Sequence, residues 1–358
     1  MKNQSQDTKD HALNPEDGQP GPYDPAPAEE DLWFLPGPEP EEAEPLAAPL
    51  PRRSCGTLFD LAEWRAAEAS LAQPLAGLSL DLGRLVERAA GFGPPVAERL
   101  AQAEAAALSW WTGDRIAPDR IALWLALRIG ATGSDGAALI RTAWAARRLA
   151  APGSAGQGGA GAIAAHLGLD TGPPSGLVGD FAALLPGPGE LGPVATGCLA
   201  FHLWRALDER PAHQRDIEAA VLGARLGFGI EAAVPGFLPL ALAGTGALTA
   251  GGTTERRLSA WIAGAHDAVL SALMGLDRLR RWRMRAEAET ADLSGRTPRL
   301  LIAGLLRHPM AAVPQLVAET GASHPAVLRN LAILERRGLV REVTGQGRYR
   351  VWAAGSGY

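Results

Sequence analysis

Residues 313–352 read VPQLVAETGASHPAVLRNLAILERRGLVREVTGQGRYRVW, and this stretch decides how the C-terminal part of the chain is interpreted. Pro314 suits the first turn of a short helix, where its missing N–H would be unpaired in any case. Gly321 supplies a tight turn, and Ser323 is placed to cap a further helix that carries Pro325 in its first turn. The pattern predicts two helices joined by a short glycine turn.

The flanking residues extend this pair to a small domain over residues 296–354. A first helix is expected from leucines at helical spacing, namely Leu300, Leu301, Leu305 and Leu306. The buried stripe of the third helix is expected at Val327, Leu331 and Leu334, and Gly338 follows as a left-handed end residue. Residues 339–344 and 348–352 are rich in β-branched and aromatic side chains around a Gly-Gln-Gly turn, which predicts a hairpin. The sum is a winged helix-turn-helix.

A domain of this kind places the N-terminal end of its third helix in the major groove of duplex DNA. We therefore expect double-stranded DNA to be read by the helix 324–337 and the wing 343–351. Arg329 suits a guanine edge or a phosphate, Asn330 suits adenine, and Leu328 reads at most a thymine methyl group. The predicted contacts from the helix are Ser323, His324, Pro325, Leu328, Arg329 and Asn330. Those from the wing are Gln346, Arg348 and Arg350.

The charge of the C-terminal part agrees with this expectation. From Asp277 to the end the chain has 14 Arg against 7 Asp plus Glu, whereas the net charge of the whole chain is −5. A basic patch supplies the salt-dependent part of DNA affinity. Five of these arginines end the preceding helical stretch: Arg278, Arg280, Arg281, Arg283 and Arg285. They are expected to support the C-terminal domain, to extend its phosphate contacts, or only to solvate a long connecting helix.

The C-terminal residues also resemble known families. The run from Ser323 to Val340 is similar to the recognition helix of many bacterial winged-helix regulators, and LERRGLVREVTGQGRYRVW (334–352) is similar to a terminal segment attached to many Fic-type proteins. The chain further resembles a bacterial family of unknown function with an all-helical body and a C-terminal helix-turn-helix. In that family AALSWWTGDRI (106–116) and LDRLRRWR (276–283) have counterparts. The resemblance implies a DNA-binding domain on a helical body.

The Fic resemblance implies no Fic activity here. A Fic active loop needs a His base, an acidic metal ligand and a Gly-Asn-Gly-Arg phosphate nest, and the nearest candidate, LLPGPGELG (184–192), lacks the His, the Asn and the Arg. A formal Gly-x-Gly-x-x-Gly at 156–161 follows a helical stretch rather than a strand, so no dinucleotide cofactor is expected. No catalytic residues, metal site or cofactor are predicted, and the protein is not expected to be an enzyme.

Two hypotheses follow for the function. The first is a DNA-binding protein, a bacterial transcriptional regulator whose helical body mediates dimerisation or senses a signal. The second is a non-catalytic Fic-like or antitoxin-like interaction module that uses its winged helix for assembly with a protein partner. Duplex retention with a steep salt dependence distinguishes the first from the second.

The rest of the chain is predicted to be mainly α-helical, in two parts. Residues 57–151 form an N-terminal helical domain, with one helix expected over 95–111, and residues 191–295 form a second helical region. The Gly/Ala/Pro-rich stretch 152–190 between them is interpreted as a linker or long loop. Four tryptophans in the first part are expected in the core or between helices: Trp110, Trp111, Trp124 and Trp144.

Residues 1–56 are predicted to be a disordered, acidic, Pro-rich tail. The first fifty residues carry 12 Asp plus Glu against 2 Lys and too few large apolar side chains to fold alone. Within the tail, DLWFLP (31–36) is a hydrophobic knot flanked by acids. It is interpreted either as a solvated leader whose aromatic pair rests on the body or as a docking motif for the basic DNA face or for a protein partner.

Composition sets the remaining expectations. The chain has 358 residues, of which 47% are hydrophobic and 20% charged, which is typical of a globular protein with a substantial core. Cys55 and Cys198 are lone thiols outside any metal or redox spacing, which favours the reducing cytoplasm. No apolar run is long enough to span a bilayer, so no membrane contact is expected. A homodimer is a further expectation.

Overall fold

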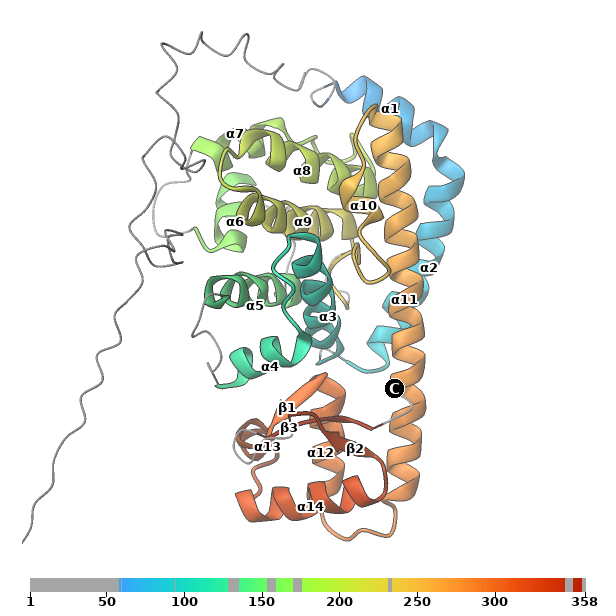
Figure 1. Cartoon of the computed structure of the whole chain (residues 1–358). Coiled ribbons are helices and arrows are strands. Elements are labelled where there is room, and N and C mark those ends of the chain that lie inside the picture. Colours follow the sequence, from blue (N-terminus) through green and yellow to red (C-terminus); the bar gives the residue numbers. More distant parts are fainter. Residues whose placement is uncertain are drawn as a thin grey trace, which may run out of the picture. The chain divides into compact units, whose positions relative to one another are not determined.

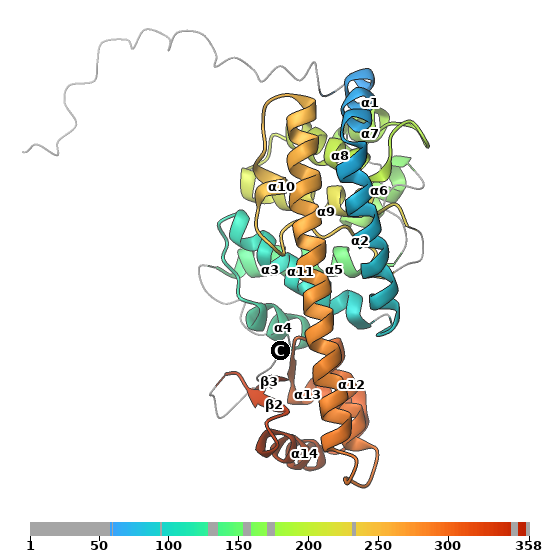
Figure 2. The ribbon, with the colours of Figure 1, turned by 90° about the vertical axis from the view of Figure 1, so that its right-hand side faces the viewer.

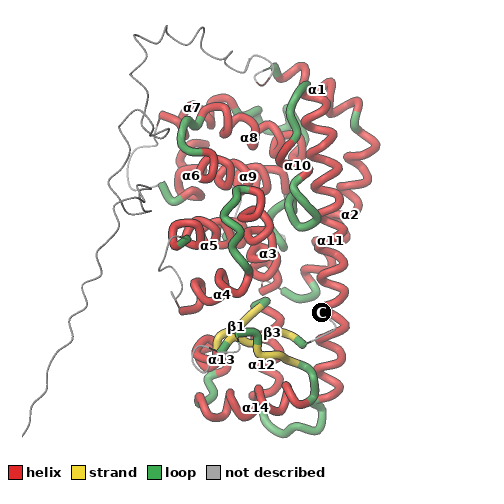
Figure 3. Tube along the Cα trace, viewed as in Figure 1, coloured by secondary structure: helices red, strands yellow, loops and turns green. Residues whose placement is uncertain are grey.

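The computed structural model describes residues 58, 60–93, 95–127, 135–152, 159–169, 176–230, 234–344 and 350–355. Within these ranges the chain is mainly helical, with fourteen helices and three short strands (Figure 3). The predicted acidic tail, residues 1–56, lies outside the described residues. Every helix in the described ranges is too short or too polar to cross a bilayer.

Ten helices precede the long helix α11. Their bounds are α1 (Leu61–Ser70), α2 (Ala72–Ala90), α3 (Pro95–Trp111), α4 (Pro118–Leu127), α5 (Gly136–Ala150), α6 (Gly159–Leu167), α7 (Gly176–Leu184), α8 (Pro193–Leu207), α9 (Ala212–Phe228) and α10 (Gly246–Thr249). The helix predicted over 95–111 is confirmed as α3. Buried side chains of these helices join those of the C-terminal elements in one hydrophobic cluster. The packing therefore continues across the sequence boundaries expected near residues 151 and 191.

The segment 152–190, predicted to be a linker or loop, contains helices in its described part. Both α6 and α7 lie within it, and Ile163 of α6 and Phe181 of α7 are buried. The Phe181 ring packs edge-on against Trp204 of α8, with ring centroids 5.1 Å apart. The prediction was wrong here because burial against distant helices outweighs the weak helix propensity of Gly.

Helices α8 and α9 pack through glycines, side by side in Figure 1. A Cβ on Gly197 of α8 would lie 2.5 Å from the carbonyl oxygen of Gly223 and 2.6 Å from the Cα of Gly227, both in α9. Distances this short require the backbones themselves to move apart. The two helix backbones are therefore in direct contact, and this close crossing positions Trp204 and Phe201 in the core.

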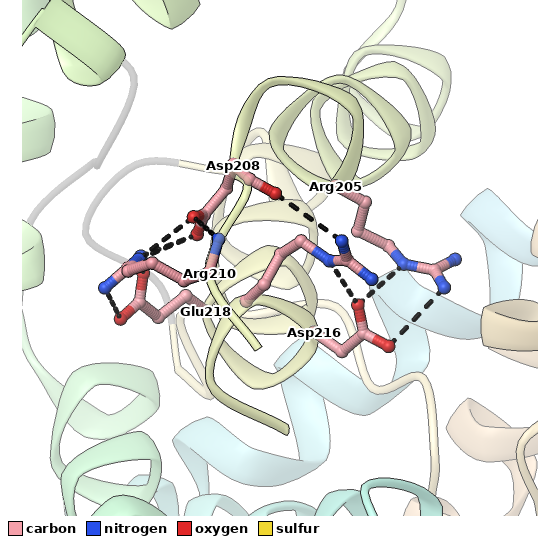
Figure 4. Close-up of polar contacts among 6 residues, drawn as sticks. Arg205, Asp208, Arg210, Asp216 and Glu218 are labelled. Carbon is pink, nitrogen blue, oxygen red and sulfur yellow. Dashed lines mark hydrogen bonds and ion pairs between the residues drawn. The ribbon is translucent and has the colours of Figure 1, made fainter. Parts of the chain in front are cut away.

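A network of charged groups closes the turn between α8 and α9 (Figure 4). Arg205 and Arg215 both pair with Asp216, at 2.9 and 3.2 Å. Arg210 pairs with Asp208 at 2.7 Å and with Glu218. Burial alone would raise the pKa of Asp208, but the hydrogen bonds from Arg210 outweigh it and hold that pKa below its ordinary value. The turn is thus fixed by charge pairs as well as by backbone.

A buried carboxyl holds the loop that follows α9. One oxygen of Glu104, Oε1, accepts the backbone N–H groups of Leu240 and Ala241, each at 2.8 Å. Glu104 is fully buried in α3, and its other oxygen, Oε2, has no hydrogen-bond partner among the described residues. Burial raises the pKa of Glu104 to about 7, although the backbone hydrogen bonds act in the opposite direction. This group ties α3 to a segment 136 residues away.

The longest element is α11 (Thr254–Glu289). Thr253 caps its N-terminus, because the Thr253 hydroxyl accepts the N–H of Arg256. Figures 1 and 2 show α11 running beside α2 and continuing to the C-terminal elements. His266 of α11 contacts Asp81 of α2 at 2.8 Å, and the hydrogen bond from this histidine is the main reason that the pKa of Asp81 is lowered. One continuous helix therefore contacts both the first helices and the last ones.

The predicted tryptophan core is confirmed for three of four residues. Trp111, Trp124 and Trp144 are partly buried against the hydrophobic cluster, whereas the side chain of Trp110 is 60% exposed. Neighbouring residues of one helix point in directions about 100° apart. Trp111 and Trp110 therefore point to different sides of α3, and only Trp111 reaches the cluster.

Six elements follow α11, in the order helix, strand, helix, helix, strand, strand. Their bounds are α12 (Thr297–Arg307), β1 (Met310–Ala312), α13 (Val313–Thr320), α14 (His324–Arg336), β2 (Val340–Glu342) and β3 (Val351–Ala354). The strands form one antiparallel sheet in the order β1-β3-β2. The three predicted helices are confirmed, and β1 is an addition that the sequence did not indicate.

Candidate nucleic-acid interface

The turn between α13 and α14 is built by local hydrogen bonds. Gly321 ends α13 in the left-handed conformation, with φ of 62°, and its N–H bonds to the carbonyl of Val317. Thr320 donates its hydroxyl to the carbonyl of Leu316 at 2.7 Å and accepts the N–H of Ala322 at 3.3 Å. A left-handed residue is inexpensive only for Gly, so the sequence predicted this turn correctly.

Close packing fixes α13 against α12. A Cβ on Gly304 of α12 would lie 2.9 Å from Cδ2 of Leu316, so a larger residue here would require the Leu316 side chain to move. Next to it, Nε2 of the buried His308 lies 2.6 Å from Oε1 of Glu319. These contacts set the position from which α14 is presented.

Helix α14 has one buried and one exposed face. Val327, Leu331 and Leu334 are fully buried, as predicted. The side chains of His324 and Arg329 make no hydrogen bond or ion pair to any described residue. Four of the six contacts predicted for the helix are exposed: Ser323, His324, Pro325 and Arg329. The helix therefore presents its N-terminal half to solvent.

The N-cap residue of α14, Ser323, makes no capping hydrogen bond with its side chain. Ser323 occupies the N-cap position with extended backbone, and Pro325 lies in the first turn, as predicted. Ser323 is exposed at the N-terminal end of the helix, where the helix dipole favours an anionic group.

Two predicted base-reading residues are engaged within the domain. The Nδ2 of Asn330 donates to the carbonyl of Ala326 at 2.8 Å, so one of its N–H groups is used inside the helix. Leu328 is half-buried and packs against the hydrophobic cluster. The structure thus leaves His324 and Arg329 exposed and turns Leu328 and Asn330 partly inward.

Of the predicted wing, residues 343–351, the structure describes only the two ends. In β2 and β3, Val340 pairs with Ala354 and Glu342 with Trp352, and the N–H of Val343 bonds to the carbonyl of Val351. Arg350 is exposed just before β3. The predicted wing contacts Gln346 and Arg348 lie outside the described residues. The base of the hairpin is therefore where the sequence predicts it.

Helix α11 holds the C-terminal elements through the segment that follows α14. The indole Nε1 of Trp282 donates to the carbonyl of Leu339 at 2.7 Å, and Arg285 donates to the carbonyl of Gly338 at 3.1 Å. Arg285 thus supports the domain, one of the roles expected for this arginine group. Arg278, Arg280 and Arg281 are exposed.

Two further arginines, which the sequence did not indicate, hold the C-terminal elements in place. Arg337, after α14, pairs with Asp292 at 2.6 Å, and its hydrogen bond holds the pKa of Asp292 below the ordinary range. Arg99 of α3 is buried and donates to the carbonyls of Leu305 and His308, at 3.1 and 2.9 Å. The sequence gives no sign of either role, because each partner is more than forty residues away.

The described residues offer no metal site, and comparison with known proteins gives no further information on function. Within the described ranges, no group of three or more His, Cys, Asp or Glu side chains is arranged to hold a metal ion. Cys198 is buried and free, and burial raises the pKa of its thiol, while Cys55 lies outside the described residues. No protein-family profile matches the chain, and no curated protein matches it.

Proposed function

We propose that residues 296–354 form a winged helix-turn-helix that binds double-stranded DNA, and that the protein is a transcriptional regulator. The element order α12-β1-α13-α14-β2-β3 supports the proposal, as does the three-stranded antiparallel sheet. In this geometry α14 lies in the major groove, and the hairpin between β2 and β3 contacts the backbone or the minor groove.

One observation carries the proposal. The N-terminal half of α14 exposes the side chains of His324 and Arg329 without partners among the described residues, and Arg329 lies on the side opposite the buried stripe. An arginine used for packing or for a charge pair, such as Arg99 or Arg337 in this chain, has its partners within the fold. The guanidinium of Arg329 is instead available to a guanine edge or a phosphate.

The remaining contacts divide between positioning and reading. Ser323 and the first turn of α14 meet a phosphate, while His324 and Arg329 reach base edges. Asn330 contributes the amide groups that its bond to Ala326 leaves over, and Leu328 contributes little beyond a methyl contact. Arg348 and Arg350 on the wing bind backbone phosphates. Specificity therefore depends mainly on two side chains of α14.

The test is fluorescence anisotropy of a labelled random-sequence duplex over a series of salt concentrations. Full-length protein is expected to bind with a logarithmic affinity that falls linearly with the logarithm of salt concentration. The double variant Arg329→Ala/Arg348→Ala should bind at least about tenfold more weakly at low salt, and its slope should be smaller by about 0.9 for each phosphate that is no longer neutralised. Selection of bound fragments from bacterial genomic DNA then identifies the operator.

A matched control removes two positive charges from a part of the chain that is not expected to bind DNA. Arg84 on α2 and Arg256 at the start of α11 are exposed and far along the chain from α14. The double variant Arg84→Ala/Arg256→Ala should keep wild-type affinity and slope. Equal losses in both double variants, or no salt-dependent binding at all, would contradict the proposal and favour a protein partner for the C-terminal domain.

A further inference from the structure

A cavity of about 510 Å³ lies between the helical body and the C-terminal elements. Residues of α3 and α11 form one wall, among them Leu100 and Leu276, and residues of β1 to β3 form the other, among them Met310 and Ala353. Its size falls in the range of small-molecule sites in proteins. Unlike the surface of α14, this site is concave.

Most of the residues that line the cavity are apolar, and one of them, Gly275, has no side chain to fill it. Gly275 faces the cavity from the middle of α11, and a Cβ built on it would meet no atom within 4 Å. A glycine inside a helix costs about 1 kcal/mol relative to alanine. Here no neighbouring atom requires the glycine, and its lack of a side chain enlarges the cavity.

The charged groups around the cavity have one sign. Arg99, Arg278 and Arg341 line it, and none of the described residues that line it is acidic. Arg99 is buried and fixed by its bonds to two carbonyls, so its positive charge is held in the wall. Arg278 and Arg341 are exposed and make no ion pair with any described residue. Positive charge beside apolar surface is stabilised by an anion, because water is partly excluded there.

We propose that this cavity binds an amphipathic organic anion, a molecule with an apolar body and a carboxylate head. The apolar body lies against Leu100, Leu276 and Met310, and the head pairs with Arg278 and Arg341. A bare phosphate would leave the apolar wall unoccupied, and a neutral hydrocarbon would leave the arginines without a counter-charge. Because the cavity walls come from both sides of the junction, the ligand bridges the body and the C-terminal elements.

Binding of this anion does not depend on DNA, so DNA is left out of the test. Isothermal titration calorimetry of the full chain compares octanoate, 1-octanol and octylammonium, which share one alkyl chain and differ in head group. Octanoate should bind about tenfold more tightly than 1-octanol, and octylammonium should not compete with it. The double variant Arg278→Gln/Arg341→Gln should lower octanoate affinity to that of 1-octanol and leave 1-octanol affinity unchanged. The control Arg280→Gln/Arg281→Gln removes two exposed charges from α11 outside the cavity and should change neither affinity.

A second pair of variants tests the location. Gly275→Leu fills the cavity and should abolish binding of octanoate and 1-octanol alike, whereas Gly83→Leu, at another helical glycine with open space around it, should not. Far-ultraviolet circular dichroism checks that each variant is folded. Equal affinities for octanoate and 1-octanol, unchanged binding in the glutamine double variant or in Gly275→Leu, or no binding at millimolar octanoate would each overturn the proposal.

Discussion

The α8–α9 hairpin and the α13–α14 pair are both two helices joined by a short turn, yet they use their residues differently. In the hairpin, Gly197 brings the two backbones into contact, and the arginines near the turn are paired with carboxylates. In the second pair, α14 buries only one stripe and exposes the other side. The side chains of the first pair mainly contact other parts of the chain, whereas one face of α14 in the second pair is exposed to solvent.

The two pairs show that the same residue type has different roles according to what surrounds it. Arg210 closes a charge network with Asp208 and Glu218, whereas Arg329 has no partner among the described residues. Substitutions in the hairpin are therefore expected to change stability, and substitutions on the outer face of α14 are expected to change binding only. Measurements of stability at both places, and at one buried carboxyl, test whether the two helix pairs differ in this way.

The largest effect is expected at the helix crossing. Gly197→Ala places a Cβ against the backbone of α9, so the helices must separate and the core around Trp204 must repack. The free energy of unfolding should fall by more than about 3 kcal/mol, the upper end of overpacking costs. Urea denaturation measures it. Gly83→Ala is the control, since its Cβ meets nothing, and it should be neutral or slightly stabilising.

The next effect depends on pH, at Glu104. The folded state raises the pKa of this group from 4.5 to about 7, so between these values the native chain holds a proton that the unfolded chain has released. The contribution of this group to the free energy of unfolding therefore decreases as pH rises from 4.5 to about 7. The full loss, about 3 kcal/mol, is reached above pH 7. Glu104→Gln keeps the acceptor for Leu240 and Ala241 and removes the charge.

The variant and the wild type should thus be equally stable near pH 4.5 and diverge as pH rises, with Glu104→Gln the more stable at pH 8. Chemical denaturation at several pH values gives the difference. Parallel curves for the two proteins would show that the buried carboxyl does not titrate in this range.

A smaller loss is expected when the charge network of the hairpin is opened. Arg210→Ala leaves Asp208 and Glu218 without their common partner, and the side chain of Asp208 is only 1% exposed. We expect a loss of about 2 kcal/mol, below the value for a fully buried pair because Arg210 itself is partly solvated. Arg84→Ala, which breaks the exposed pair with Asp81, should cost less than about 1 kcal/mol in the same assay.

The smallest effect on stability belongs to α14. Arg329→Ala should change the free energy of unfolding by less than about 0.5 kcal/mol, as at an ordinary exposed site. Its effect should be confined to DNA affinity. A loss as large as that of Arg210→Ala would remove the distinction between the two helix pairs and assign Arg329 a role in the fold.

Local signals explain why so much of the C-terminal part was predictable. A left-handed glycine at 321, a cap position at 323 and a helical stripe at Val327, Leu331 and Leu334 are each set by residues a few positions apart. The strand β1 carries no such signal, because three residues are too few to show an alternation. It exists because β3 pairs with it.

The mainly helical class, the bounds of α3 and the turn-helix unit of α13 and α14 can be predicted from the sequence, because backbone preference and apolar spacing act between near neighbours. The other features depend on tertiary contacts. Helices α6 and α7 form in a Gly-rich segment because they pack against distant helices. Tertiary packing likewise leaves Trp110 exposed and buries Glu104, which accepts the N–H of Leu240. It also assembles the cavity from α3, α11 and the sheet. Burial and charge pairing depend on residues that are far apart in the chain. They stabilise an element only after folding has brought those residues into contact.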